Sequence, residues 1–214
     1  LHMHRGTPYI YEGEELGMTN AHFTKLEQYR DLEALNGYRQ RVEEAKCQSS
    51  ESMMAALALI GRDNARTPMQ WDASKYAGFT APDAPVEPWI SVNPNHVEIN
   101  AAEEFDDPES VYTFYKKLIA MRHNSATIAA GEWHLLAADD EQVYAFTRVD
   151  GDDTILVAVN LTDRSAALPS DVAELLSDGV NESQVLLSTY DAMHSVKSIA
   201  HGELARWEGV VIQL

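Results

Sequence analysis

Two kinds of hydrophobic spacing divide the chain. Apolar positions recur at helical spacing in three stretches up to about residue 124, and they alternate with polar positions after Gly131. A period near 3.6 predicts amphipathic helices, and a period of two predicts half-buried strands. The predicted helices cover 31–45, 49–60 and 107–124, and the predicted strands cover 132–137, 143–149, 154–161, 183–190 and 209–214. The pattern thus predicts a helical first part followed by a β-rich second part.

The ends of the predicted helices carry capping signals. The first helix places its apolar residues close to one face: Leu32, Leu35, Tyr38 and Val42. The second opens on serines and ends at Gly61, a residue typical of helix C-termini. For the third, we expect Asp107 to be the N-cap and Pro108 to lie in the first turn.

The β-rich part contains a hairpin signal. The acidic turn 150–153 separates two alternating runs, and the second run places on one face Ile155, Val157, Val159 and Leu161. Several short strands separated by polar turns predict an antiparallel sandwich that continues to Leu214. Near the start, "TPYIYEG" from Thr7 to Gly13 is rich in aromatic and β-branched residues, which predicts a short buried strand.

Between Arg62 and Pro108 no period persists and six prolines occur. A stretch of this length without regular structure is usually functional or disordered. Its aromatic residues predict packed order instead of disorder: Trp71, Tyr76, Phe79 and Trp89.

Charge and cysteine content narrow the class of function. The 214 residues include 16 Lys plus Arg and 34 Asp plus Glu, a formal charge of −18 that repels nucleic acids and anionic membrane surfaces. The single cysteine, Cys47, excludes a disulfide framework and a thiolate zinc site, which favours a reducing, cytoplasmic location. The longest apolar run, Met53–Ile60, is far shorter than the roughly 20 residues of a membrane-spanning helix. We therefore expect neither a nucleic-acid partner nor a membrane.

Two segments together carry a family resemblance. "GTPYIYEGEELGM" matches a G-x-P-x-x-Y-x-G-x-E pattern through Gly6, Pro8, Tyr11, Gly13 and Glu15, and "RDNARTPMQWD" spans Arg62–Asp72. With "YRDLEALN", "PWISVNPNHVEIN" and "FYKKLIAMRH", they resemble the alpha-amylase family of glycoside hydrolases, family thirteen, and within it the oligo-1,6-glucosidase and alpha-glucosidase group. The resemblance is nearly continuous to about residue 124 and weaker beyond it.

The resemblance implies an architecture. Members of the family carry a (β/α)₈ barrel followed by an antiparallel β-sandwich. Thr7–Gly13 would then be the eighth barrel strand, Val111–Arg122 the last barrel helix, and Gly131–Leu214 the sandwich. We therefore expect an α+β fragment with two domains: residues 1–128 as the end of the barrel, and residues 129–214 as an all-β C-terminal sandwich.

The resemblance also implies a reaction, retaining hydrolysis of an α-glucoside. This reaction uses two carboxyl groups about 5 Å apart, and in the family they come from earlier strands. We assign no catalytic residue here, and we expect the chain to be a C-terminal portion that is inactive alone. Glu14 and Glu15 would point to opposite faces of a continued strand. The acids in the turn 150–153 are more often solvated, and His2 and His4 have no partner ligands at metal-site spacing. We expect no metal and no cofactor.

What the resemblance transfers is sugar binding. In the group, the first arginine of the motif reaches the subsite of the non-reducing glucose, which implies this role for Arg62, whose guanidinium presents five donors in a fixed fork. Arg66 would lie nearer the entrance, with an ion pair to Asp63 or Asp72 as an equal alternative. Trp71 is expected to anchor its loop, and two residues of the G-x-P segment, Tyr11 and Glu15, are expected to be structural supports.

Two other functions stay open at this point. The β-rich part would bind a glycan without catalysis if aromatic residues formed a row, but its aromatics show none: Trp133, Tyr144, Phe146, Tyr190 and Trp207. A purely structural part would expose apolar surface and self-associate when isolated. The resemblance leaves linkage open, because trehalose-6-phosphate hydrolases and sucrose isomerases share much of this loop.

Overall fold

The structure is a computed structural model that describes residues 1–214, and its contacts divide the chain into two compact units. Unit 1 comprises Leu1–Tyr9 and Lys117–Leu214, and unit 2 comprises Ile10–Lys116. The boundary falls inside helix α4 (Val111–Asn124). None of the helices is both long and apolar enough to cross a membrane. The family-based division into 1–128 and 129–214 describes domains of a longer architecture, and it stays a prediction.

Unit 2 is built from short helices and irregular chain, without a strand. Its core combines both helices of a hairpin with residues before and after them: Ala21, Phe23, Tyr29, Ala34, Met53, Leu57 and Ile90. Its elements are η1 (Glu14–Leu16), η2 (Leu26–Gln28), α1 (Leu32–Tyr38), η3 (Arg39–Glu44), α2 (Ser50–Ile60), η4 (Arg62–Arg66), η5 (Pro94–Val97), α3 (Ala101–Glu104) and the start of α4.

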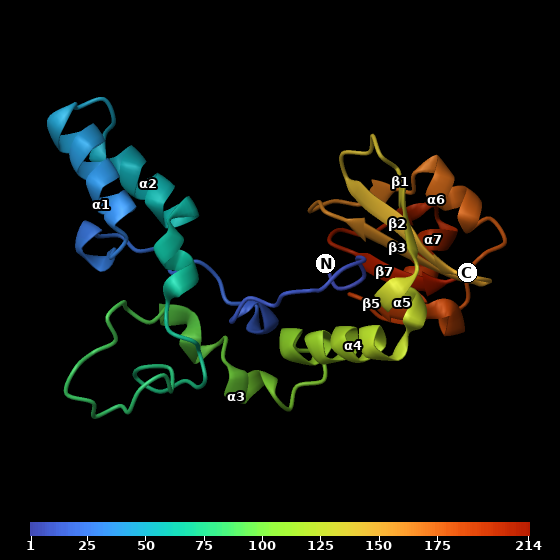
Figure 1. Cartoon of the computed structure of the whole chain (residues 1–214), viewed down its shortest axis with the longest axis horizontal. Helices are drawn as coiled ribbons and strands as arrows, with labels where there is room; N and C mark the ends of the chain where they lie inside the picture. Colours follow the sequence, from blue (N-terminus) through green and yellow to red (C-terminus); the bar gives the residue numbers. More distant parts are fainter. The chain divides into compact units, whose positions relative to one another are not determined.

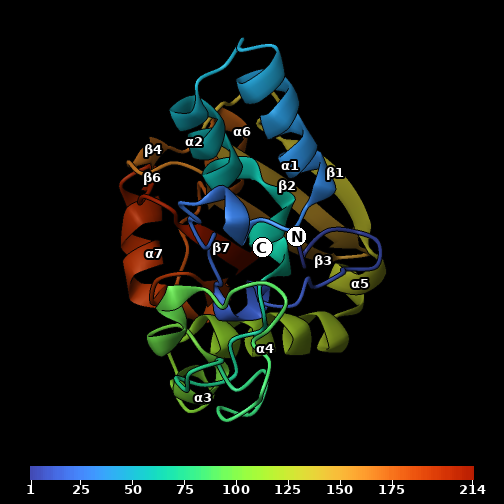
Figure 2. The same cartoon turned by 90° about the vertical axis from the view of Figure 1, so that its left-hand side faces the viewer.

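The first two predicted helices are confirmed as α1 and α2, and these two helices lie side by side (Figures 1 and 2). Asp31 caps α1 by accepting from the Glu33 amide, and Ser49 caps α2 by accepting from the Ser52 amide. After Tyr38 the helix continues as the π-helical turn η3. Leu32, the first residue of α1, was expected in the buried face but is 71% exposed, and the buried residue of this helix is Ala34.

The long connection after η4 is largely irregular, as expected (Figure 1). Tyr76 is buried, whereas the other aromatic residues of the stretch are about half exposed. The expected cap of α4 was wrong. Asp107 accepts from the Glu109 amide in a preceding turn, and the helix starts at Val111. The Ser110 hydroxyl accepts from the Thr113 amide and takes the capping position.

The predicted strand at Thr7–Gly13 was also wrong. Residues 7–11 are irregular, and the Tyr11 carbonyl already accepts from the Glu14 amide in a turn. A strand needs a neighbouring strand to pair with its backbone groups. No segment of this chain pairs with residues 7–11, so aromatic and β-branched composition alone does not produce the strand.

Unit 1 is centred on a five-stranded antiparallel sheet with the order β1-β2-β3-β7-β5. All five predicted strands are confirmed, including the β2–β3 hairpin, in which Asp150 pairs with Asp153. The unit contains the end of α4, α5 (Ala126–Ala130), β1 (Glu132–Leu136), β2 (Val143–Asp150), β3 (Asp153–Asn160), β4 (Ala166–Ala167), α6 (Ser170–Leu175), η6 (Glu182–Gln184), β5 (Val185–Ser188), α7 (Ala192–Ala200), β6 (Glu203–Leu204) and β7 (Gly209–Gln213).

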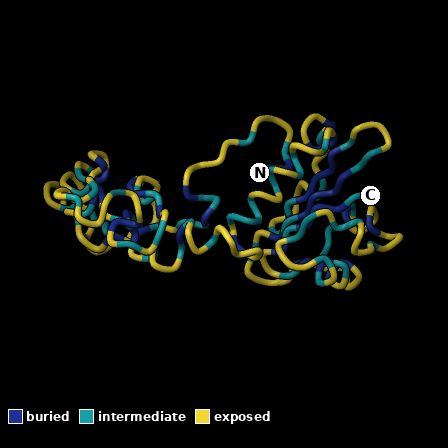
Figure 3. The backbone as a smooth tube through the Cα atoms, turned by 90° about the horizontal axis from the view of Figure 1, so that it is seen from below, coloured by how far each residue is buried: buried dark blue, intermediate teal, exposed yellow.

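The central strands of the sheet are buried on both faces (Figures 1 and 3). One face of β3 carries Ile155 and Val157, which pack with Ile128 of α5. The opposite face carries Leu156 and Ala158, which pack with residues from α6 and α7. The predicted alternation is therefore right for Ile155 and Val157. Leu161, however, follows the last strand residue and is 59% exposed.

The second layer of this unit is not an all-β sandwich. Helices α6 and α7 and the two-stranded sheet of β4 and β6 cover one face. Helix α7 was not among the predicted elements, and two of its buried positions are serines, Ser195 and Ser198. The Ser195 hydroxyl donates to Oε1 of the fully buried Glu208 at 2.6 Å, so a polar contact replaces an apolar one. The β-rich part is thus an antiparallel sheet with helical cover.

Two arginines of unit 1 hold the start of the chain through carbonyl groups. Arg148 on β2 is fully buried and donates to the carbonyls of Met3, Ile128 and Gly131 at 2.8, 2.5 and 2.7 Å. Arg122 on α4 donates to the carbonyls of residues 2, 4 and 6. Burial lowers the pKa of Arg148, since it disfavours the charged form.

We predict that Arg148→Met destabilises the protein by about 3 kcal/mol, because it leaves three carbonyls without their donor in a buried site. Chemical denaturation in urea, followed by circular dichroism, measures the change. Arg164→Met is the control, because Arg164 is exposed. A stability for Arg148→Met equal to that of the control would contradict the assigned role.

Candidate functional site in the second unit

The motif arginines lie on a short helix that packs against the start of α1. The link between the two is Asp63, which is fully buried. Its Oδ2 accepts from the backbone amides of Arg30 at 2.7 Å and Asp31 at 2.8 Å. A buried carboxylate requires such donors because its desolvation is otherwise costly. Asp63 therefore fixes η4 against the segment that precedes α1.

Arg62 forms a bidentate ion pair with Asp31. Its Nε and Nη2 lie 2.7 Å from Oδ2 and Oδ1 of that carboxylate, and Nη2 also lies 2.8 Å from Oε2 of Glu33. The hydrogen bond from Arg62 lowers the pKa of Asp31 and raises the pKa of Arg62 itself. Nη1 takes no part in these contacts, and the side chain is 55% exposed. The guanidinium is thus oriented by protein carboxylates while one edge faces outward.

Arg66 points toward the same acids over longer distances. Its Nη1 lies 3.4 Å from Oδ1 of Asp63 and 3.8 Å from Oδ2 of Asp31. The ion pair to Asp63 that the sequence offered as an alternative is therefore present. Asp72, the other partner considered, instead accepts from the Ser74 amide at 2.8 Å. The structure brings both arginines to one acidic cluster, and their sugar-binding roles stay predictions.

Each arginine borders its own pocket. The Arg62 pocket has a volume of about 400 Å³ and is lined by residues that include Leu59, Ile60, Arg62 and Asn64. The Arg66 pocket has a volume of about 460 Å³ and is lined by residues that include Arg66, Pro68, Phe79 and Trp89. The two pockets share lining residues: Tyr11, Glu12, Met18, Ala65 and Thr67. They are therefore neighbours with a common wall.

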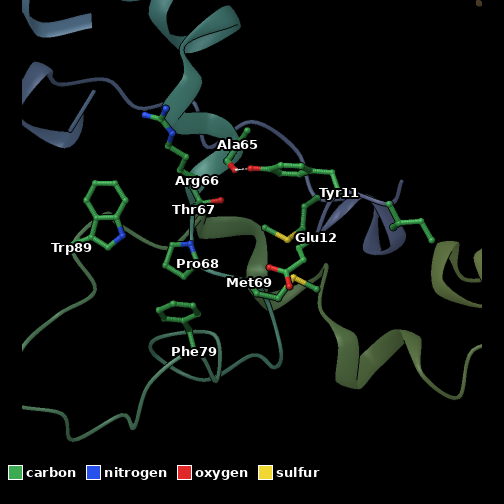
Figure 4. Close-up of a pocket in the computed structure, with 11 residues that line it drawn as sticks. Tyr11, Glu12, Ala65, Arg66, Thr67, Pro68, Met69, Phe79 and Trp89 are labelled. Atoms are coloured by element: carbon green, nitrogen blue, oxygen red, sulfur yellow. Dashed lines mark hydrogen bonds between the residues drawn. The ribbon is translucent and has the colours of Figure 1, made fainter. Parts of the chain in front are cut away.

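The common wall is held by Tyr11, whose hydroxyl donates to the Ala65 carbonyl at 2.7 Å (Figure 4). In the same view, Trp89 and Phe79 lie beside Pro68, whereas Tyr11 and Glu12 lie on the other side of it. The supporting role expected of Tyr11 is thus present as a bond between the G-x-P segment and η4. Residue composition alone did not indicate this contact, which joins positions 54 residues apart.

The two adjacent acids of the G-x-P segment do not face each other. They lie in the 3₁₀ turn η1, not on a strand. Oε2 of Glu15 accepts from the Gly13 amide at 2.7 Å, which confirms a supporting contact. Oε1 of Glu14 accepts from the Tyr115 hydroxyl at 3.3 Å, and burial, together with Glu14, raises the pKa of Tyr115 to about 12. Nothing in this arrangement pairs the two carboxylates for catalysis.

The expectation that Trp71 anchors its loop was wrong for the side chain, which is 52% exposed. The buried neighbour is Gln70, whose side-chain amide donates to the Ile99 carbonyl. The backbone provides the remaining contacts: the Ala101 amide donates to the Gln70 carbonyl at 2.9 Å, and the Trp71 amide donates to the Ala77 carbonyl at 2.8 Å. The sequence did not indicate that Gln70 would be buried, because it is a polar residue between Met69 and Trp71.

The remaining candidates lie apart from these pockets. His4 belongs to unit 1 and stacks on Tyr144 with ring centroids 5.6 Å apart, and burial lowers its pKa. No group of three His, Cys, Asp or Glu side chains is arranged to hold a metal ion. The acids of the turn 150–153 include Asp153, which accepts from the Gln213 side chain at 2.6 Å. Each of these residues has a local packing role.

We predict that Asp31→Asn destabilises the protein at pH 7 while leaving the α1 cap in place, because asparagine also caps helices. In the folded protein, the pKa of Asp31 lies below its ordinary value of about 3.9. The stability that its charge contributes is therefore present above about pH 4 and is lost as the pH falls through the lowered value. Thermal unfolding midpoints of the wild type and the variant should converge on acidification.

The matched controls separate charge from capping. Asp31→Ala removes both and should cost about 1 kcal/mol more than Asp31→Asn. Asp83→Asn changes an exposed carboxylate and should leave the midpoint unchanged at either pH. A constant difference between Asp31→Asn and wild type from pH 7 to pH 3 would disprove the ion-pair contribution.

The sequence of this chain is similar to those of several curated proteins. The chain is 41% identical, over its whole length, to an oligo-1,6-glucosidase of Parageobacillus thermoglucosidasius, of which it covers 36%. It is 52% identical over 71% of its length to an alpha-glucosidase of Pediococcus pentosaceus, of which it covers 26%. The chain thus spans about a third of the length of the curated relatives that it matches.

Solved structures give the same picture. A trehalose-6-phosphate hydrolase of Bacillus licheniformis matches 99% of the chain with a TM-score of 0.81 and 36% identity, and the match covers 36% of that enzyme. A trehalulose synthase variant in complex with sucrose matches 98% of the chain with a TM-score of 0.78 and 36% identity, and the match again covers 36% of that chain. The model of the alpha-amylase catalytic domain matches residues 1–131, so the chain belongs to the alpha-amylase family of glycoside hydrolases.

Proposed function

We propose that this chain is the C-terminal part of a retaining alpha-glucosidase that releases the non-reducing glucose of short α-linked oligosaccharides. In this proposal, the chain supplies a substrate-pocket loop and the C-terminal domain. The catalytic carboxylates come from a part of the enzyme outside these residues. Relatives named oligo-1,6-glucosidase and alpha-glucosidase support the class of reaction.

The proposal rests mainly on how the side chain of Arg62 is held and where it lies. It combines a fixed orientation, through the bidentate pair with Asp31, with a half-exposed side chain that lines a pocket of about 400 Å³. An arginine held in this way presents donors at a set position, which suits the vicinal hydroxyl groups of a sugar. Arg66 borders the neighbouring pocket and is assigned the weaker, outer contact.

The proposal concerns α-glucosidic bonds as a class. Relatives with different products share this part of the chain, since the matches include a trehalose-6-phosphate hydrolase and a trehalulose synthase. Residues that distinguish linkages are therefore expected largely outside it. A cytoplasmic location belongs to the same proposal and rests on the single cysteine, Cys47, which is exposed and unpaired.

We predict that Arg62→Lys in the product of the complete gene lowers kcat/KM for an α-glucoside about 100-fold, because lysine cannot reproduce the two-point contact. Steady-state hydrolysis of isomaltose and of maltose measures the effect. The control is Arg39→Lys, because Arg39 is exposed and pairs only with Glu44 at 3.5 Å.

The two outcomes that would overturn the proposal are distinct. Wild-type protein that hydrolyses no α-glucoside would refute the assigned reaction. Activity that survives in both Arg62→Lys and Arg62→Gln would leave the reaction in place but remove Arg62 from the binding site. Because Arg62 also pairs with Asp31, both variants should unfold at a lower midpoint than the wild type, so the kinetics are measured well below the midpoint of each variant.

We also propose that the 214-residue chain self-associates when it is produced alone, the behaviour expected of a structural part. Leu59 and Ile60, at the end of α2, are 70% and 78% exposed and line the Arg62 pocket. Adjacent exposed apolar residues of this size favour association. Light scattering should show an oligomer that Leu59→Lys weakens, with Leu161→Lys, a change of an exposed leucine in unit 1, as control. A monomer at all concentrations would disprove this.

A further inference from the structure

The Arg66 pocket has a chemical character that the family motif does not explain. Three aromatic residues of the long loop remain about half exposed: Trp71 at 52%, Phe79 at 49% and Trp89 at 59%. Only Phe79 and Trp89 line the pocket. Exposed aromatic rings that gather at a concave site are typical of ligand binding.

The backbone at both positions is fixed, although the rings are exposed. The Trp89 carbonyl accepts from Nε of Arg30 at 2.8 Å, and the next residue, Ile90, is fully buried. The Phe79 amide donates to the carbonyl of the buried Tyr76 at 2.9 Å. The loop therefore holds the two rings at defined positions without covering them, an arrangement that suits a recognition surface.

Gly78 tightens the turn that presents Phe79. Its φ of +65° lies in the left-handed region, and a Cβ there would approach Oδ2 of Asp72 to 2.7 Å. Only glycine accommodates both conditions without strain. Asp72 in turn accepts from the Ser74 amide, so the acid is part of the turn and fixed in place. The backbone that presents Phe79 is thus fixed by local geometry.

The polar groups of the same pocket complete the chemistry. Thr67 lines it next to Arg66, and Glu12 lines it on the other side of Pro68 (Figure 4). A pyranose ring has one face of C–H groups and an edge of hydroxyl groups. The negative face of an aromatic ring attracts the C–H face, and carboxylate, hydroxyl and guanidinium groups bind the hydroxyls. An aromatic wall with a few polar groups fits a sugar ring better than it fits a purely apolar ligand.

Because the Arg62 and Arg66 pockets are neighbours, two successive sugar rings of one substrate would occupy them in turn. They share the wall around Tyr11 and Ala65, and each has a volume near the lower end of the range of about 300–1,000 Å³ typical of ligand sites. If the non-reducing glucose contacts Arg62, the next ring of the same oligosaccharide lies within reach of the neighbouring pocket. This step rests on the function proposed above.

We propose that Phe79 and Trp89 bind the second sugar ring of the α-glucoside, in the Arg66 pocket. They act as residues that determine substrate length, and they do not touch the bond-forming atoms of the first glucose. The substrates favoured would be those with at least two sugar rings.

The test compares a substrate with one ring and a substrate with two, using the product of the complete gene. α-Glucosyl fluoride occupies only the first position, and isomaltose occupies both. Trp89→Ala should raise KM for isomaltose about tenfold and leave kcat/KM for α-glucosyl fluoride unchanged. Trp89→Phe should restore most of the isomaltose KM. Phe79→Ala should act in the same direction as Trp89→Ala.

The matched control is Trp71→Ala. This residue belongs to the same loop and is similarly exposed, yet it does not line either pocket. Trp71→Ala should leave KM for isomaltose and kcat/KM for α-glucosyl fluoride unchanged. Equal loss on both substrates for Trp89→Ala, with a lower unfolding midpoint, would assign Trp89 a structural role and refute the proposal. Unchanged kinetics on both substrates would also refute it.

Failure of the proposed function gives a different result. Wild-type protein that cleaves neither substrate refutes the assigned reaction, and equilibrium binding then tests the sugar site without catalysis. Tryptophan fluorescence titrated with isomaltose should show saturable binding in wild type and in Trp71→Ala, and at least tenfold weaker binding in Trp89→Ala. Equal binding in all three proteins would overturn the proposal.

Discussion

The buried carboxylate of Asp63 is the constraint on which the site in unit 2 depends. It joins two segments that lie more than 30 residues apart, through the amides of Arg30 and Asp31. The charge is satisfied mainly by backbone groups, so replacing it would leave two amide donors unpaired as well. Arg62 and Arg66 then sit on a helix whose position is already set. Their ion pairs follow from that placement and do not create it.

Unit 1 also contains a fully buried charged side chain, but this one is positively charged. Arg148 is a buried cation that has carbonyl partners and no carboxylate. Carbonyl oxygens carry partial negative charge, and three of them accept from Nη1 and Nη2 of this guanidinium, whereas its buried Nε has no hydrogen-bond partner. In a chain with a formal charge of −18, this buried cation is thus held without an acidic side chain.

The elements that could be predicted from the sequence are those whose residues carry both a regular hydrophobic period and a turn or capping signal at their ends. The β2–β3 hairpin combined alternation with an acidic glycine turn, and α2 combined a serine cap with a terminal glycine. Thr7–Gly13 failed because strand formation needs a partner, which composition does not report. Helices α6 and α7 were not predicted, and in α7 two of the buried positions are serines. Burial of a hydroxyl is set by a distant acceptor, here Glu208.

The candidate site shows the same division. The motif identified Arg62 and Arg66, and it correctly raised Asp63 as a partner of the second. It gave no sign that Asp31 would hold the first, because that contact joins an N-cap residue of one helix to another helix. The exposed rings of Phe79 and Trp89 were equally hidden, since an aromatic residue in an irregular loop is buried or exposed according to the folded path of its neighbours.

The bidentate pair between Arg62 and Asp31 has an entropic consequence. A free arginine side chain carries about 2 kcal/mol of rotamer entropy, which a ligand must suppress when it binds. Here the rotamer is already selected by the protein, at the folding stage and not at the binding stage. In the proposed complex, a sugar would meet a side chain with little freedom left to lose, so the entropic cost of ordering that side chain would be small.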